Sequence, residues 1–210
     1  MATPIPGNRA AFTLGEIAAA TGGTIRGGAP DLTVAGVTTD SRSDVRGKLF
    51  VALTGERFDG HRFLGDAVQG GAGAVLVHRG SMGASGIPAV EVDDTLSALG
   101  GLARAHRRRW GGTLVAVAGS AGTTPPRSAI AAALEAVAPG AVHSVPGNLN
   151  NRIGVPMVLF GLGSEHGVAV VEIGTNLPGE VRELTAIASP NIGVLTLIDV
   201  EHAEGLGTLD

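Results

Sequence analysis

The amino-acid sequence predicts an α/β protein in which a small α/β domain is followed by a domain with a parallel sheet. The chain of 210 residues is 44% hydrophobic but only 3% aromatic, so small aliphatic side chains must build its core. Its 34 glycines indicate many tight turns. Beyond residue 113, apolar runs alternate with helical patterns, as in a parallel sheet covered by helices.

The first half of the chain contains a series of short elements. Thr13 and Glu16 have the spacing of a capping box, which predicts a helix at about 14–21. The leucines after Asp94 recur at helical spacing, which predicts a long helix that Asp94 caps and that ends near residue 110. Between these helices we expect strands at 32–38, 48–53, 74–77 and 89–92 and a helix at 61–69.

After Gly111 and Gly112 the pattern begins afresh, so we place a domain boundary at about 110–113. This boundary divides the chain into domains 1–112 and 113–210. The second domain is expected to contain strands at 114–118, 168–172 and 192–198 and helices at 128–137 and 179–188.

Composition restricts the class of function. The formal net charge is -4, and the one basic cluster, Arg107 to Arg109, closes a predicted helix, where cations suit the helix dipole. The sequence has no cysteine, no apolar run of membrane-spanning length and no signal peptide, and its first residues read as a short leader. We therefore predict a cytoplasmic protein with no nucleic-acid partner and no membrane insertion.

Residues 115–130 (VAVAGSAGTTPPRSAI) have the layout of a phosphate-binding loop, with a strand, a glycine turn and a helix. Gly119 and Gly122 allow the backbone N–H groups at the helix start to approach an anion. Thr123 stands where the lysine of such a loop is expected, so that Thr123 and Thr124 offer hydroxyls but no charge. An ordinary strand-to-helix turn explains the same pattern.

Two prolines alter the start of this helix. Pro125 disfavours the α region at Thr124, and Pro125 and Pro126 each remove an N–H donor. We therefore expect the helix to begin later than in a working loop. Arg127 lies one turn after Thr123 and can reach back, although a guanidinium differs from an ammonium in shape and position.

Several motifs, taken in their order along the chain, resemble the Mur ligase family from about residue 12 to residue 207. The N-terminal motifs are TDSR at 39–42, GKLFVAL at 47–53 and GERFDGHRF at 55–63, followed by AVLVH at 74–78 and VDDTLSALGGLARAHRRR at 92–109. Beyond the glycine turn, the motifs are NNRIGVP at 150–156, VEIG at 171–174 and SPNIGV at 189–194.

This resemblance implies a function for each domain. In the family, the first domain holds the UDP end of a muramyl peptide, the central domain binds ATP, and a third domain completes the nucleotide site. The reaction forms an acyl phosphate that an amine attacks to give an amide, with magnesium neutralising phosphoryl charge. Domain 1–112 is then the UDP-substrate-binding domain, and domain 113–210 is an incomplete P-loop-type parallel sheet domain with an altered P-loop.

The resemblance also assigns candidate site residues. Asp40, Ser41 and Arg42 match the motif beside the UDP-sugar site, although Asp and Ser also favour a plain turn. Glu172 and His202 match the family's metal-site residues, whereas an exposed acid at a strand end and a surface histidine are the simpler interpretations. The candidate cofactor-binding residues are Gly119, Gly122, Thr123, Thr124, Arg127, Asn150 and Asn151, of which the paired asparagines also fit a plain loop.

Two departures from the family qualify this interpretation. The loop lacks its lysine, and the chain ends at Asp210, before the rest of the central domain and the C-terminal domain. Asp199 and Glu201 also add carboxylates around His202. Three hypotheses follow. The first is an ATP- and Mg²⁺-dependent peptide ligase of peptidoglycan precursor biosynthesis, present here as a fragment of a longer chain or as half of a split enzyme, and impaired or inactive until a partner chain supplies the missing domain. The second is a catalytically inactive homologue that binds a UDP-muramyl-peptide-like molecule, and the third is a structural partner that binds neither ligand.

Overall fold

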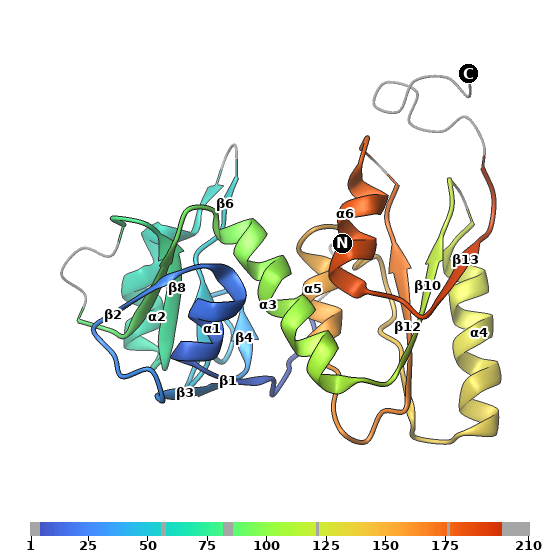
Figure 1. Cartoon of the computed structure of the whole chain (residues 1–210), viewed down its shortest axis with the longest axis horizontal. Coiled ribbons are helices and arrows are strands. Elements are labelled where there is room, and N and C mark those ends of the chain that lie inside the picture. The colour runs from blue at the N-terminus through green and yellow to red at the C-terminus, as the bar shows by residue number, and fades with distance from the viewer. Residues whose placement is uncertain (1–4, 56–57, 82–85, 121, 176, 199–210) are drawn as a thin grey trace. The chain divides into compact units, whose positions relative to one another are not determined.

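The computed structural model describes residues 5–55, 58–81, 86–120, 122–175 and 177–198, and it confirms the α/β class (Figure 1). The chain forms two compact units: residues 7–105, and residues 106–210 together with the first six. The division falls inside α3 (Thr95–Trp110), because the last turns of this helix bond to the second unit. There, His106 Nε2 donates to Leu162 O at 3.0 Å and Arg107 Nε donates to Ala188 O at 3.1 Å. The predicted roles of the two domains stay predictions.

The first unit is built on a five-stranded sheet in the order β2, β9, β8, β5, β4, in which only the pairing of β2 with β9 is antiparallel. The bounds of these strands are Thr24–Arg26, Ala89–Val92, Ala74–His78, Leu49–Val51 and Val37–Thr38. Two antiparallel pairs accompany the sheet, β1 (Ala11–Thr13) with β3 (Thr33–Ala35) and β6 (Thr54–Gly55) with β7 (Phe58–Asp59). The helices before α3 are α1 (Leu14–Thr21), the 3₁₀ turn η1 (Gly60–Phe63) and α2 (Leu64–Gln69).

Local sequence signals account for much of the first unit. The predicted helix at 14–21 is confirmed as α1, and its capping box is formed: Thr13 Oγ1 accepts from Glu16 N at 3.1 Å, and Glu16 accepts from Thr13 N at 2.8 Å. The predicted strand at 32–38 is instead two strands, β3 and β4. Gly36 separates them with φ +111, and a Cβ there would lie 2.8 Å from Asn8 O, so only glycine suits this position.

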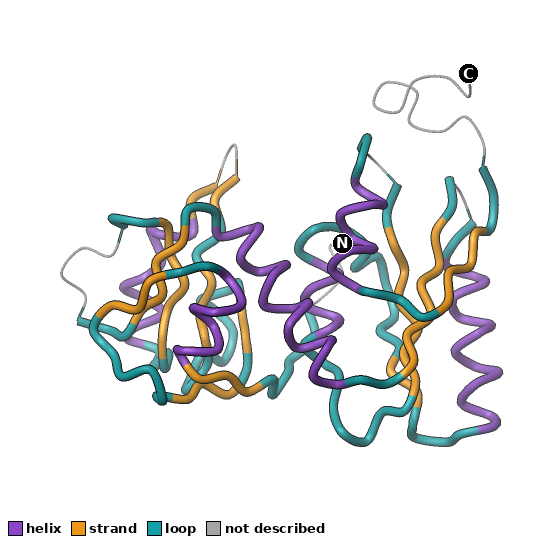
Figure 2. The backbone as a smooth tube through the Cα atoms, viewed as in Figure 1, coloured by secondary structure: helices purple, strands orange, loops and turns teal. Residues whose placement is uncertain are grey.

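The second unit contains a four-stranded parallel sheet in the order β11, β12, β10, β13, with bounds Val142–His143, Val168–Ile173, Thr113–Ala118 and Ile192–Leu195. Helix α4 (Thr124–Val137) covers one face, while α5 (Gly154–Leu159) and α6 (Glu180–Ala188) lie on the other (Figure 2). Ile130, Ala131 and Leu134 of α4 pack against Val115, Val117 and Val170, which form the core under this helix.

The start of α4 corrects the sequence prediction. The helix begins at Thr124 rather than near 128, and Thr123 is already in the α region with φ -75 and ψ -33. Pro125 and Pro126 lie in the first turn, where an N–H has no acceptor within the helix, and the first helical bond runs from Arg127 N to Thr123 O at 3.1 Å. The prolines therefore do not delay the helix.

Among the described residues, no helix combines the length and apolar character needed to cross a membrane.

Candidate functional site

The glycine turn after β10 has the backbone features that the sequence predicts. Gly119 is buried, and a Cβ there would overlap Thr196 Oγ1 and lie 3.1 Å from Leu197 N and Leu197 O. Gly122 adopts φ +68, a conformation that favours glycine. Ser120 N donates to Leu197 O at 2.9 Å, so this amide is held by the segment that follows β13. The turn is therefore tightly packed on its β13 side.

Glu172 is the centre of a buried polar cluster beside this turn. It lies near the carboxyl end of β12, in register with Val117 of β10, and is only 6% exposed. Thr124 Oγ1 donates to Glu172 Oε2 at 3.1 Å, and Asn150 Nδ2 donates to Glu172 Oε1 at 3.0 Å. Three predicted site residues, from a helix start, a loop and a strand, thus meet at the carboxyl edge of the sheet, where open α/β sheets bind ligands.

Arg127 belongs to the same cluster and is 5% exposed. Its Nε lies 3.5 Å from Glu172 Oε2 but has no hydrogen-bond partner in the described part of the chain. Its Nη1 donates to Val145 O at 2.6 Å and to Ser144 Oγ at 3.3 Å. The guanidinium is thus held between the carboxylate and the segment after β11, and its predicted contact with a phosphate stays a prediction.

The paired asparagines separate into two roles. Asn150 reaches Glu172, whereas Asn151 Oδ1 accepts from Ile153 N at 3.1 Å and from Gly154 N at 2.8 Å. Asn151 therefore stabilises the start of α5, which is what a plain loop residue does. Its predicted cofactor contact stays a prediction.

The oxygen atoms of the cluster fit a magnesium ion. Mg²⁺ takes oxygen ligands, usually one or two carboxylates together with substrate phosphates, and Thr124 and Glu172 offer a hydroxyl and a carboxylate. Within the described ranges, no three His, Cys, Asp or Glu side chains gather to hold a metal by themselves. His202, the other predicted metal residue, lies outside the described residues.

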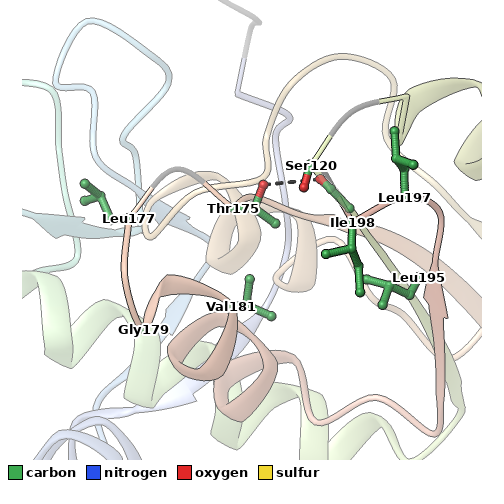
Figure 3. A pocket seen from close by; sticks show the side chains of 9 residues that line it. Ser120, Thr175, Leu177, Gly179, Val181, Leu195, Leu197 and Ile198 are labelled. Carbon is green, nitrogen blue, oxygen red and sulfur yellow. Dashed lines mark hydrogen bonds between the residues drawn. The ribbon is translucent and has the colours of Figure 1, made fainter. Parts of the chain in front are cut away.

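A pocket of about 240 Å³ opens beside the glycine turn, at the carboxyl ends of β10, β12 and β13 (Figure 3). Its walls are mostly apolar, and Thr175 Oγ1 donates to Gly119 O at 3.2 Å on its polar side. Sequence reasoning missed this pocket, because it placed Leu195, Leu197 and Ile198 in one strand at 192–198, whereas β13 ends at Leu195. The lining residues are Gly119, Ser120, Thr175, Leu177, Gly179, Val181, Leu195, Leu197 and Ile198.

The predicted UDP motif lies in the first unit, just after β4. Arg42 clamps Asp40 with both ends of its fork, because Nε donates to Oδ1 at 2.9 Å and Nη2 donates to Oδ2 at 2.8 Å. This side-chain hydrogen bond is the largest cause that lowers the pKa of Asp40 below its usual range. Ser41 lies half-buried in the same turn. The side chains of Arg42 and Asp40 are 88% and 41% exposed, so solvent reaches the pair.

The first unit also contains a histidine cluster that sequence reasoning did not single out. His61 Nδ1 lies 2.7 Å from Asp59 Oδ1, and His61 Nε2 accepts from His78 N at 3.0 Å. Because Nε2 is an acceptor, Nδ1 carries the proton that Asp59 receives as a hydrogen bond. The signal in the sequence was the Asp-Gly-His spacing in GERFDGH. His78 ends β8, so the cluster and Asp40 both lie at the carboxyl edge of the first sheet.

Comparisons with known proteins match both units of the chain. The model of the Mur ligase family catalytic domain matches residues 33–107, and the model of the Mur ligase middle domain matches residues 117–210. The glycine turn and the Glu172 cluster lie within the second match, and the turn that contains Asp40 lies within the first.

The chain is also similar to curated relatives and solved structures. It is 40% identical over 197 residues to the UDP-N-acetylmuramoyl-tripeptide–D-alanyl-D-alanine ligase of Escherichia coli (strain K12), covering 94% of this chain and 42% of that protein. A crystal structure of MurF from Acinetobacter baumannii matches with a TM-score of 0.86 and 33% identity, covering 98% of this chain and 44% of that one. A MurF ligase from Thermotoga maritima in complex with ADP matches with a TM-score of 0.71 and 30% identity, covering 82% and 39%. The chain spans about two fifths of the length of the curated relatives it matches.

Proposed function

The chain belongs to the Mur ligase family, and on this premise we propose that it acts in the ATP-dependent amide ligation of peptidoglycan precursors, as a MurF-type protein. The observation that carries the proposal is the meeting of Thr124, Asn150 and Glu172 beside the start of α4. A helix start with a hydroxyl and a carboxylate at a sheet edge suits a nucleotide phosphate and its cation. The predicted cytoplasmic location belongs to the same proposal.

In this proposal the residues of the second unit bind and orient the phosphates. The N–H groups and hydroxyls at Thr123 and Thr124 face the phosphate oxygens, and the α4 dipole favours their negative charge. Glu172 and Thr124 hold magnesium, which neutralises charge on the transferred phosphoryl when it is bound. Thr123 supplies no positive charge where a lysine is usual, so we expect MgATP to bind more weakly than at a complete loop.

The first unit is proposed to bind the UDP end of a muramyl peptide. Asp40, Ser41 and Arg42 lie at the carboxyl edge of its sheet, and the fork of Arg42 is suited to a diphosphate. The substrate carboxylate would be activated as an acyl phosphate and then attacked by an amine. The parts of the relatives that this chain does not span are supplied by further polypeptide, on the same chain or on a partner chain.

A second candidate is a non-catalytic Mur ligase homologue that binds a UDP-linked ligand or serves as a scaffold. The loop favours it, because Thr123 replaces the lysine and Arg127 is held by Val145 O rather than free beside the turn. In that case the first unit binds its ligand while the second binds no nucleotide.

Calorimetric titration with MgATP and, separately, with a UDP-muramyl tripeptide tests both candidates. The ligase proposal expects MgATP binding that Thr124→Ala and Glu172→Gln each weaken about tenfold or more. Thr185→Ala in α6 serves as a control that leaves MgATP binding unchanged. Binding of the UDP ligand alone supports the second candidate. If the folded wild-type protein binds neither ligand, the ligase proposal and the binding of a UDP-linked ligand are both wrong, and the scaffold role alone is left.

A further inference from the structure

Two buried side chains of opposite charge lie side by side where a divalent cation is expected. Arg127 and Glu172 are 5% and 6% exposed, and Arg127 Nε lies 3.5 Å from Glu172 Oε2. At this separation and burial, the guanidinium cancels most of the field that the carboxylate presents to another cation. A metal ion approaching Glu172 therefore meets a neutral pair rather than a free negative charge.

The fold fixes the guanidinium in this place. Nη1 of Arg127 donates to Val145 O and Ser144 Oγ, while the backbone N of Arg127 makes the first helical bond of α4. Arginine keeps its charge at every pH that a protein experiences. The positive charge at Glu172 is thus a permanent part of the site.

The carboxylate is also satisfied by neutral donors. Thr124 Oγ1 and Asn150 Nδ2 each occupy one of its oxygens. A divalent cation must displace or share these contacts, and Mg²⁺ gives up its water reluctantly unless phosphates add negative charge.

We propose that Arg127 is a resident counter-ion of Glu172 that keeps divalent cations weakly bound until the phosphates of a nucleotide arrive. The inference rests on the proposed function for the role of the nucleotide, but the counter-ion itself can be tested with a metal alone. The metal ion and the nucleotide would then bind together, and a divalent cation without nucleotide would bind Glu172 only weakly. Arg127 acts here as a positioning residue for the cation, through Glu172.

The test is a titration of the protein with Mn²⁺ in the absence of nucleotide, in which electron paramagnetic resonance measures the concentration of free Mn²⁺. Since the net charge of the ligands sets affinity, we expect wild type to bind at Glu172 with Kd weaker than about 1 mM, and Arg127→Gln to bind about tenfold more tightly or better. Adding Glu172→Gln to Arg127→Gln should remove the gain. A merely structural defect would not create a tighter metal site.

Arg152→Gln is the matched control. Arg152 also pairs with a glutamate of the second unit, Glu183, at 2.7 Å, but these side chains are 40% and 41% exposed and lie outside the cluster. The control removes the same charge from the same unit, and it should leave Mn²⁺ affinity unchanged. A similar gain in Arg152→Gln would mean that net charge alone governs binding, which overturns the proposal.

Two further results would overturn it. One is a folded Arg127→Gln protein with unchanged Mn²⁺ affinity; if that variant does not fold, Arg127→Met, of similar length, takes its place. The other is a wild-type Kd for Mn²⁺ tighter than about 0.1 mM, with binding that Glu172→Gln abolishes. This second result needs no arginine variant. Repeating the titration with ATP separates the two proposals: a gain in Arg127→Gln without any effect of ATP supports the counter-ion and contradicts the nucleotide role.

Discussion

Each unit joins a carboxylate to an arginine at the carboxyl edge of its sheet, but the two pairs differ in burial. Asp40 and Arg42 lie two residues apart in one turn, with side chains 41% and 88% exposed. Glu172 and Arg127 join a strand to a helix, and both side chains are 6% exposed. The first pair can open toward a ligand at little cost, because water solvates each partner. The second pair is part of the fold, because neither charge can be left alone without water.

The largest effect should come from breaking the buried pair. Arg127→Ala leaves the Glu172 carboxylate buried without its cation, which we expect to lower the free energy of unfolding by about 3 kcal/mol in the absence of divalent cations. Urea unfolding monitored by tryptophan fluorescence measures this loss of stability. The probe is Trp110, the one tryptophan of the chain, which is hydrogen-bonded to His166 O in the second unit.

The exposed pair provides the contrast when urea unfolding is followed by far-UV circular dichroism, which reports both units, because Trp110 lies in the second unit. Arg42→Ala should leave the unfolding midpoint unchanged, since an exposed pair contributes little to stability. Equal, small effects of the two variants would contradict the difference drawn between the pairs. Mn²⁺ added to Arg127→Ala should restore part of its lost stability, because a ligand that binds only the folded state stabilises it.

A moderate effect is expected from the packing of the glycine turn. In Gly119→Ala the new methyl group overlaps Thr196 Oγ1 and presses on the backbone of Leu197, which we expect to cost about 1–3 kcal/mol. Gly167→Ala is the matched control, because a Cβ at Gly167 meets no atom within 4 Å. Chemical denaturation of both variants measures the difference, and equal stabilities would mean that the turn adapts to a side chain.

The sequence predicted the parts of this site that depend on local or topological rules. Parallel strands end at one edge, so a strand followed by a glycine turn and a second strand ending in Glu172 had to place Thr124 and Glu172 near each other. The burial of Arg127 could not be predicted, because it depends on Val145 O, a backbone atom of a segment with no pattern of its own. The start of α4 was mispredicted for a similar reason: the local effect of Pro125 on Thr124 was outweighed by the helix packing on β10 and β12.

A smaller, pH-dependent effect distinguishes the units. Burial lowers the pKa of His106 and of His143, each of which donates to a carbonyl oxygen, Leu162 O and Val158 O respectively. A histidine with a lowered folded pKa stabilises the fold above its unfolded pKa of about 6.5, and this contribution is lost as pH falls through that value toward the folded pKa. The second unit should therefore lose stability on mild acidification.

The first unit should respond only at lower pH. The pKa of Asp40 is lowered chiefly by Arg42, that of Asp59 by His61 and that of Glu91 by Arg26. These carboxylates stabilise the fold above their unfolded pKa of about 4, and the contribution is lost only below it. Hydrogen exchange at pH 7, 6 and 5 should show protection falling first in 106–198, and an equal fall in 7–105 would contradict this assignment.

The smallest effect concerns Asp40 itself. Since the side-chain hydrogen bond from Arg42 is the largest cause of its lowered pKa, Arg42→Gln should raise the pKa of the Asp40 carboxyl toward its usual range. Titration of the carboxyl carbon by NMR measures the shift, and an unchanged pKa in the variant would mean that the clamp is not formed in solution. A diphosphate that draws Arg42 away should produce the same rise in wild type, because the carboxylate then loses the same donor. The exposed pair thus predicts a spectroscopic signal for ligand binding, whereas the buried pair, held by the fold, predicts a change in metal affinity.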